Sequence, residues 1–495
     1  MDYDVLIVGA GSAGCVLAAR LSKDPKRSVL LLEAGPDYPS PADLPPEISN
    51  GYSAVYTHDW GYYSEPELSA NPIHLVRAKL VGGCSATNAT FALRGTPADY
   101  DEWAAAGNPG WSFDEVLPAF RRLETDLDFH NQWHGTDGPL PIRRYPAHEL
   151  TPAQSAFLEA CQAAGFPLVD DHNAPNAMGA GPSPMNTING IRQSTALTYL
   201  AQARQRPNLT IRSDVLVDRV VFEKKRAVGV RLAEPAETIR AGHVILSAGS
   251  YGSPAILIRS GIGPADHLKS LGISVLEDLA GVGQNLIDHP LLALVFAADL
   301  PEVENVPAFQ TTLTLKSNPA LPDHDLHINP VSVYTDHGAG QFMILVSVLK
   351  PLSRGQLRLR SSDPAANPQI SLGYFSDPAD MPPLLEAVRV ARQLARTPPL
   401  SRLAARELIP GPGVTAGHGL EAAIRANIMS YHHPVGTCRM GSSDGAVVDA
   451  RGRVHGVAGL SVIDASIMPS IPAANTNLPT IMIAEHCAAW FQERL

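Results

Sequence analysis

The sequence of 495 residues has few charged side chains and no long apolar run. Charged residues make up 18% of the chain and apolar residues 45%, a balance that excludes an intrinsically disordered protein. No stretch of about 18 uninterrupted apolar residues occurs, so no membrane-spanning helix is predicted. Basic residues are also in deficit (38 against 49 acidic), which gives a formal net charge of −11. Because nucleic-acid binding generally needs a basic face for phosphate, we expect no nucleic-acid partner.

Cysteine is scarce, and its positions lie far apart. The five cysteines are Cys15, Cys84, Cys161, Cys438 and Cys487, and they form no CxxC pair. The spacing argues against a disulfide framework and a zinc site, so no metal is predicted and free thiols in a reducing compartment fit best. The amino terminus has no basic segment followed by an apolar stretch, as a signal peptide would. We therefore expect a cytoplasmic protein, and the sequence leaves its oligomeric state open.

The first forty residues follow the order strand, glycine-rich turn, helix, strand, acidic residue. The apolar run Tyr3–Val8 predicts a short buried parallel strand, and Gly-Ala-Gly-Ser-Ala-Gly follows over residues 9–14. A helix is predicted over about Cys15–Ser22, and a second strand over Ser28–Leu32 ends at Glu33. This order is typical of a dinucleotide-binding unit, although a plain turn between strand and helix can also be rich in glycine.

The three glycines of this turn have different tasks. Gly9 permits the tight turn, Gly11 lets the backbone approach a pyrophosphate, and Gly14 lets the helix pack closely on the strand. The helix N-terminus then faces the phosphate charge. Glu33 ends the second strand, where its carboxylate can accept hydrogen bonds from ribose hydroxyls. The pattern by itself does not separate FAD from NAD.

Later segments change in character along the chain. Further strands are predicted over 215–222, 227–230 and 243–247, antiparallel strands within 291–430 (for example 342–348 and 356–360), and helices over 383–397 and 480–492. We therefore predict an α/β protein (α+β overall) that has a Rossmann-like nucleotide-binding domain and an inserted antiparallel-sheet domain. The binding crevice should lie where the two domains meet.

The predicted domains are discontinuous. Residues 1–145, 190–290 and 445–495 are assigned to the nucleotide-binding domain. Residues 146–189 and 291–444 are assigned to the substrate-binding domain. Most of the chain should therefore behave as one cooperative unit.

Six segments, met in order along the chain, carry a family resemblance. They are Val-Gly-Gly-Cys-Ser-Ala-Thr-Asn-Ala at 81–89, Gly-Ser-Tyr-Gly-Ser-Pro at 249–254 with Ser-Gly-Ile-Gly-Pro at 260–264, Gly-Val-Gly-Gln-Asn-Leu-Ile-Asp-His-Pro at 281–290, Pro-Leu-Ser-Arg-Gly at 351–355, His-Pro-Val-Gly-Thr-Cys-Arg-Met-Gly at 433–441, and the stretch from Asp464 to Thr480. Together they resemble the signatures of the glucose–methanol–choline family of FAD-dependent oxidoreductases over nearly the whole chain.

The resemblance implies a set of FAD contacts. These are Gly9, Gly11, Ser12, Ala13, Gly14, Glu33, Ala34, Gly82, Gly83, Asn88, Ala89, Val217, Ala248, Gly249, Asp464, Ala465, Thr476, Asn477, Pro479 and Thr480. Asn475, Thr476 and Thr480 are expected beside the isoalloxazine edge at a helix N-terminus. Some family members bind FAD covalently through a histidine at the position of Thr87. Threonine cannot form that bond, so non-covalent FAD is predicted.

The resemblance also implies a catalytic pair. The family's catalytic imidazole maps onto His433, which we expect to act as the general base. Asn477 is expected to orient the hydroxyl and to donate a hydrogen bond to the developing alkoxide. His432 precedes it and is interpreted as a pocket-lining residue. His289 and His134 are interpreted as structural.

The expected reaction is oxidation of a primary alcohol to the aldehyde by hydride transfer to flavin N5, with O2 reoxidising the flavin to give H2O2. The resemblance makes aryl and furan alcohols the candidate substrates. The sequence shows neither an anionic cluster that would demand a quaternary ammonium group nor a polar cluster that would demand a sugar. The alternative is an alcohol dehydrogenase that passes electrons to a quinone or another acceptor. A hydroxynitrile lyase or a photodecarboxylase on the same fold is a more distant alternative.

Overall fold

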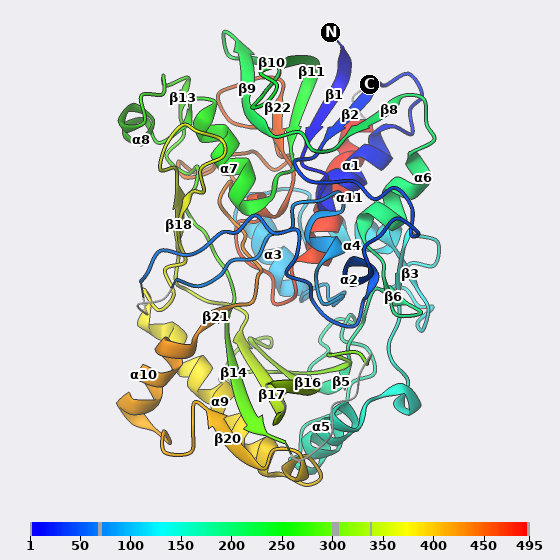
Figure 1. The fold of residues 1–495 in the computed structure, drawn as a ribbon, viewed down its shortest axis with the longest axis vertical. Coiled ribbons are helices and arrows are strands. Elements are labelled where there is room, and N and C mark those ends of the chain that lie inside the picture. The colour runs from blue at the N-terminus through cyan, green and yellow to red at the C-terminus, as the bar shows by residue number, and fades with distance from the viewer. Residues whose placement is uncertain (1, 68–71, 299–305, 337–338, 493–495) are drawn as a thin grey trace.

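Two sheets organise the chain, and each is assembled from segments that are far apart in the sequence (Figure 1). The computed structural model describes residues 2–67, 72–298, 306–336 and 339–492. The first sheet lies at the top of Figure 1 and the second at the bottom. Among the described residues, no helix has the length and apolar character needed to cross a membrane.

The first sheet has seven strands in the order β8-β2-β1-β11-β10-β9, with β22 beside β11. Their bounds are β1 Tyr3–Val8, β2 Val29–Leu32, β8 Leu209–Arg212, β9 Val217–Glu223, β10 Arg226–Leu232, β11 Thr238–Leu246 and β22 Leu460–Val462. The pairs among β8, β2, β1, β11 and β22 are parallel. Their central strands read as continuous apolar runs because helices and loops cover both faces.

The second sheet has seven strands in the order β20-β14-β17-β16-β15-β5, with β21 beside β14. Their bounds are β5 Ala180–Pro182, β14 Pro290–Ala297, β15 Thr311–Leu315, β16 Leu326–Asp336, β17 Ala339–Val348, β20 Arg406–Ile409 and β21 Met429–Ser430. All its pairs are antiparallel. Helices α5 (Pro152–Ala163) and α9 (Met381–Arg396) pack against one face, and the other face is turned to the interior of the molecule.

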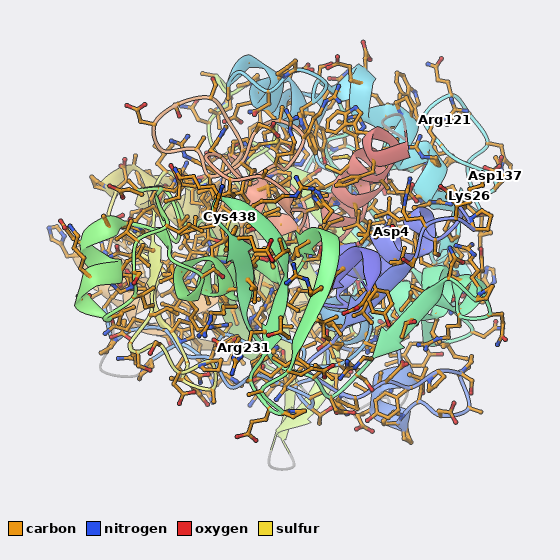
Figure 2. All side chains as sticks on the ribbon, turned by 90° about the horizontal axis from the view of Figure 1, so that it is seen from above. Asp4, Lys26, Arg121, Asp137, Arg231 and Cys438 are labelled. Carbon is orange, nitrogen blue, oxygen red and sulfur yellow. The ribbon has the colours of Figure 1, made fainter. Side chains whose placement is uncertain are left out.

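Helices α1 (Ser12–Leu21) and α11 (Asn477–Gln492) pack against each other behind the first sheet (Figure 1). The remaining helices are α2 Pro46–Ser49, α3 Pro97–Ala105, α4 Phe113–Leu123, α6 Ala201–Ala203, α7 Gly249–Arg259, α8 Ala265–Ser270 and α10 Gly417–Asn427. The remaining strands form small two-stranded pairs, which are β3 Glu124–Asp126 with β4 Leu140–Ile142, β6 Thr187–Ile188 with β7 Ile191–Arg192, β12 Ile262–Gly263 with β13 Glu277–Asp278, and β18 Gln356–Arg358 with β19 Gln369–Ser371. Figure 2 shows charged side chains such as Lys26, Arg121 and Asp137 at the periphery, whereas Cys438 is buried.

The expected fold class is confirmed, and the boundaries differ in detail. The first helix begins at Ser12, before the expected Cys15, and the last helix begins at Asn477 instead of Thr480. The predicted strand over 356–360 is short and pairs with β19 outside the large sheet. The division into two discontinuous domains stays a proposal, supported by the two sheets.

Candidate active site

A cavity of about 1050 Å³ lies between the first sheet and the inward face of the second. Seventeen of the predicted FAD residues line it, namely Gly9, Gly11, Ser12, Ala13, Glu33, Ala34, Gly83, Asn88, Ala89, Val217, Ala248, Gly249, Asp464, Ala465, Thr476, Asn477 and Thr480. The adjacent histidines His432 and His433 line it as well. Gly14, Gly82 and Pro479 do not line it. The structure therefore brings most of the predicted FAD residues and both histidines around one cavity.

We call the end of the cavity beside the glycine-rich turn (residues 9–14) the dinucleotide end. Glycine is required there because two backbone segments cross. At Gly14 a Cβ would lie 1.9 Å from the carbonyl oxygen of Gly9, so this residue serves the close packing of α1 on β1. At Gly83, where φ is +51°, a Cβ would lie 2.6 Å from the Cα of Gly11. Helix α1 starts at this crossing, and no side chain caps its N-terminus. Its free amides and positive dipole end are thus available to a phosphate.

Glu33 lines the same end of the cavity and is held by the backbone. Its Oε2 accepts from the amide of Ala10 (2.9 Å) and its Oε1 from that of Gly35 (3.0 Å). Burial raises the pKa of Glu33 to about 7, against the opposing effect of these amides. The remaining lone pairs of the carboxylate can accept from a ribose hydroxyl.

His433 lies at the opposite end, and both of its ring nitrogens have partners. Nε2 accepts from Asn475 Nδ2 (3.2 Å), and Nδ1 lies 3.0 Å from Nδ1 of His289. The backbone amide of His433 donates to Asp288 Oδ1 (2.8 Å). Burial lowers the pKa of His433 well below its usual value, and the neighbouring His289 and Arg77 lower it further because they disfavour a second cation beside them. The imidazole is therefore neutral and able to accept a proton.

Asn477 was expected to act together with His433, but its side chain makes its hydrogen bond elsewhere. Asn477 is the first residue of α11, and its Oδ1 accepts from Ser12 Oγ of the glycine-rich turn (2.7 Å). Asn475, two residues earlier and outside the helix, contacts His433 instead. Two asparagines within three residues gave the sequence no means of choosing, because the choice depends on contacts made across the fold.

Tyr431 and Asn329 complete the surroundings of His433. The ring of Tyr431 lies 4.3 Å from the imidazole, centroid to centroid. Its hydroxyl accepts from Asn329 Nδ2 (3.0 Å). Neither residue was singled out from the sequence, since a tyrosine and a strand asparagine are ordinary there.

His432 also lines the cavity, as expected, but the backbone between the two histidines turns sharply. Its φ of +62° lies in the left-handed region, which is rare for a residue with a side chain. Arg77 Nη2 donates to its carbonyl (2.6 Å), and its amide donates to Ser430 Oγ (2.8 Å). Burial lowers the pKa of His432 to about 3, so this ring stays neutral.

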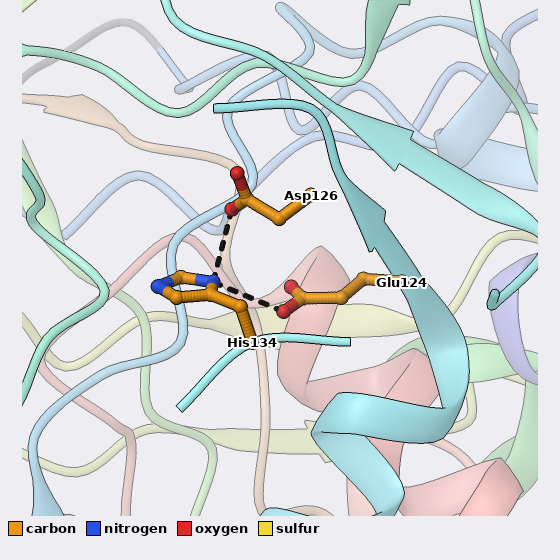
Figure 3. Close-up of side chains that lie close together, drawn as sticks. All are labelled: Glu124, Asp126 and His134. Atoms are coloured by element: carbon orange, nitrogen blue, oxygen red, sulfur yellow. Dashed lines mark hydrogen bonds and ion pairs between the residues drawn. The ribbon is translucent and has the colours of Figure 1, made fainter. Parts of the chain in front are cut away.

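A second cluster of buried ionisable groups surrounds His134 (Figure 3). Its Nδ1 lies 3.1 Å from Glu124 and 2.9 Å from Asp126, and its Nε2 lies 2.8 Å from Asp171. Although burial alone would lower it, hydrogen bonds to these carboxylates raise the pKa of His134 to about 10. Arg94 pairs with Glu124, and Arg144 pairs with Asp126 and Asp171.

These three carboxylates therefore face three cations. Glu124, Asp126 and His134 are close enough to hold a metal ion, but the protonated imidazole and the two guanidinium groups already balance the charge. We interpret the cluster as a buried ion-pair network. It ties β3 to Arg94, which lies five residues after the segment 81–89, and the structural role expected for His134 has this physical basis.

Comparisons with known proteins agree with this geometry. The N-terminal model of the GMC oxidoreductase family matches residues 3–291, and the C-terminal model matches residues 351–484. An oxygen-dependent choline dehydrogenase of Photobacterium profundum is 36% identical over 98% of this chain and 92% of that protein. A GMC-type oxidoreductase of Rhodococcus erythropolis is 37% identical over 99% and 98%.

Solved structures give the same picture. Pyridoxine 4-oxidase from Mesorbium loti is 31% identical, with a TM-score of 0.93 and coverage of 100% of both chains. A formate oxidase is 24% identical, with a TM-score of 0.90 over 99% of this chain and 98% of that one, and supports the fold alone. The similarity therefore extends over both sheets and the cavity between them.

Proposed function

The chain belongs to the GMC oxidoreductase family, and on that premise we propose that it oxidises a primary alcohol bearing an apolar aryl or furan group to the aldehyde, with O2 as the electron acceptor. Family membership makes it an FAD-binding oxidoreductase that acts on CH–OH donors. The observation that carries the finer proposal is a neutral His433 paired with Asn475 at one end of a cavity whose opposite wall is apolar.

The cavity fits FAD at its dinucleotide end. The uncapped start of α1 and the glycine crossing at Gly11 and Gly83 leave room and free amides for a pyrophosphate. We propose that the predicted contact residues that line the cavity hold the cofactor. Bound FAD supplies the hydride acceptor. We also propose that it is not covalently attached, because Thr87, which lines the cavity, cannot form the bond that a histidine forms.

His433 and Asn475 can divide the work on a hydroxyl group. A hydroxyl between them would donate to Nε2 of His433 and accept from Nδ2 of Asn475, whose present separation is 3.2 Å. As the carbon loses hydride, the hydroxyl proton moves to His433 Nε2. The amide of Asn475 then stabilises the negative charge that builds on oxygen. We assign to Asn475 the role that was expected of Asn477.

The second sheet supports an uncharged apolar substrate. Side chains on its inward face alternate with core side chains, and those that line the cavity are Leu291, Ala293, Val295, Val331, Met343 and Leu345, next to Phe309. In the described part of the chain, the acidic residues that line the cavity are Glu33 and Asp464, both from the dinucleotide side.

As far as the structure describes the second sheet, a quaternary ammonium group in the cavity would therefore meet no carboxylate there. It would also approach the guanidinium of Arg77, which lines the cavity. Burying a charge against apolar side chains is costly. This favours a neutral aromatic alcohol over choline, although several relatives are choline dehydrogenases.

O2 as acceptor is supported by two relatives, an oxygen-dependent choline dehydrogenase and a pyridoxine 4-oxidase. The alternative is a dehydrogenase that passes electrons to a quinone or another carrier.

A cytoplasmic location is proposed on the separate ground that all five cysteines are unpaired.

The test is a panel of alcohols added to the anaerobic holoenzyme while flavin absorbance is recorded. Benzyl and furfuryl alcohols should bleach the flavin, whereas choline and glucose should act far more slowly. Admitting air should restore the colour with one H2O2 formed per alcohol consumed. Bleaching without H2O2 would favour the dehydrogenase, and no bleaching by any alcohol would leave a lyase or photodecarboxylase.

A further inference from the structure

His289 lies behind His433, on the side away from the cavity. It is fully buried and does not line the cavity. The two rings are nearly perpendicular, with an interplanar angle of 89° and centroids 5.2 Å apart. Their Nδ1 nitrogens lie 3.0 Å apart. Such a contact is a hydrogen bond only if one nitrogen carries a proton and the other does not.

The partner of the far nitrogen decides which one carries the proton. His289 Nε2 lies 2.9 Å from the carbonyl oxygen of Leu349. A carbonyl only accepts, so His289 Nε2 must carry its proton, and Nδ1 of the neutral ring is left as an acceptor. Burial lowers the pKa of His289 to about 3, which keeps this ring neutral. The proton between the rings therefore belongs to His433 Nδ1.

The contact on the other side of His433 requires the same tautomer. Asn475 Nδ2 donates to His433 Nε2, which must then hold a lone pair. Three hydrogen bonds thus run in one direction, from Asn475 to His433, from His433 to His289, and from His289 to Leu349. The reverse tautomer of His433 would set two lone pairs against each other at the 3.0 Å contact.

We propose that His289 is a positioning residue that fixes the tautomer of His433, so that the nitrogen facing Asn475 and the alcohol is always the unprotonated Nε2. The inference rests on the proposed role of His433 as base. When His433 takes the hydroxyl proton at Nε2, its Nδ1–H bond to His289 becomes charge-assisted and stronger. His289 Nε2 keeps its own proton, which it donates to the carbonyl oxygen of Leu349, so no substrate proton passes beyond this ring.

The backbone around the pair is held in place by polar contacts. Asp288, directly before His289, accepts from the amide of His433 and from the hydroxyl of Ser430. The hydroxyl of Tyr374 contacts both Asp288 Oδ2 (3.1 Å) and the carbonyl of His289 (3.2 Å). Asp288 is thus part of the same support as His289. A fixed backbone is what a tautomer-selecting hydrogen bond needs.

The test compares two substitutions that differ in where they place an acceptor. His289→Asn puts an amide oxygen near the position of Nδ1, so it can still accept from His433. His289→Gln puts its amide near the position of Nε2, where it can bind the carbonyl of Leu349 but offers His433 no acceptor. A matched control is His243→Gln, because His243 is a largely buried histidine of β11 whose partner is Ser461.

The first readout is ¹⁵N NMR of histidine-labelled holoenzyme, with the His433 signals identified by their loss in His433→Gln. The wild type and His289→Asn should show His433 protonated at Nδ1 only. His289→Gln should show a mixture of tautomers, and its rate of anaerobic flavin reduction by alcohol should fall about 10- to 100-fold, while FAD content and KM change little. The control should behave as the wild type.

Two results would overturn the inference. One is a wild-type His433 protonated at Nε2, and the other is a folded His289→Gln variant with the wild-type tautomer and rate. The NMR result stands apart from the proposed function, since it needs no substrate. If no alcohol bleached the wild-type flavin, the proposed function would fail, and the tautomer measurement would still decide the role of His289.

Discussion

Replacing Asn475 and Asn477 by alanine, one at a time, distinguishes the roles of these two asparagines, which lie just before α11 and at its first residue. Asn475 donates to His433 Nε2 at 3.2 Å and is 8% exposed. Asn477 accepts from Ser12 Oγ at 2.7 Å, at the dinucleotide end. If the account is right, Asn475→Ala slows the chemical step, and Asn477→Ala mainly weakens the hold on FAD.

The sizes of the two effects follow from what each side chain touches. Loss of one buried donor to a developing oxyanion costs about 10²- to 10³-fold in rate, or about 2.7–4 kcal/mol. Loss of a neutral, partly exposed hydrogen bond costs about 0.5–1.5 kcal/mol, which is roughly 2- to 13-fold in affinity. Flavin reduction by an alcohol should therefore be slower in Asn475→Ala than in Asn477→Ala by at least about tenfold.

The assay is stopped-flow reduction of the flavin by benzyl alcohol without oxygen, with FAD affinity measured in parallel by fluorescence. Each variant is compared at saturating FAD, so that cofactor loss does not imitate slow chemistry. The reasoning is refuted if Asn477→Ala is the slow variant while Asn475→Ala reduces its flavin at the wild-type rate.

Three further outcomes are expected. The folded-state pKa of His134, about 10, lies above its unfolded value of about 6.5. The stability that protonated His134 contributes is therefore complete below about pH 6.5 and is lost as the pH rises towards 10. Over this range, the free energy of unfolding measured by thermal denaturation should fall more steeply with pH in the wild type than in His134→Gln, by up to about 1.4 kcal/mol per pH unit. Gly83→Ala should abolish FAD binding, because its Cβ would meet the backbone of Gly11 at 2.6 Å, whereas Gly413→Ala, with nothing within 4 Å, should bind FAD normally; equal binding would refute the crossing argument. Acid precipitation should release the yellow colour into the supernatant, and colour left in the pellet would disprove non-covalent FAD.

The dinucleotide end was readable from the sequence because its determinants are local. The order of strand, turn and helix and the spacing of Gly9, Gly11 and Gly14 follow from backbone geometry within a few residues. The helix nevertheless starts at Ser12, earlier than the apolar run suggested. The small residues Ser12 and Ala13 belong to the first turn of α1, where they line the cavity, so their size does not mark a loop before the helix.

The end of the cavity that holds His433 could be predicted only in part, because the residues that contact one another there are far apart in the sequence. His433 and His289 are 144 positions apart, and Asn477 meets Ser12 across 465. Nothing near Asn475 or Asn477 tells which side chain faces His433, and nothing near His289 distinguishes it from an ordinary buried histidine. The same holds for His134, whose carboxylate partners lie 8 to 37 positions away.

The central claim is that His433 is the base for an alcohol oxidised at this cavity. The most direct measurement is the rate of anaerobic flavin reduction by benzyl alcohol in the wild type and in His433→Ala, with His432→Ala as the neighbouring control. The account predicts a loss of about 10²- to 10⁴-fold for His433→Ala and a much smaller loss for His432→Ala. A loss below tenfold for His433→Ala, with His432→Ala severe, would contradict it.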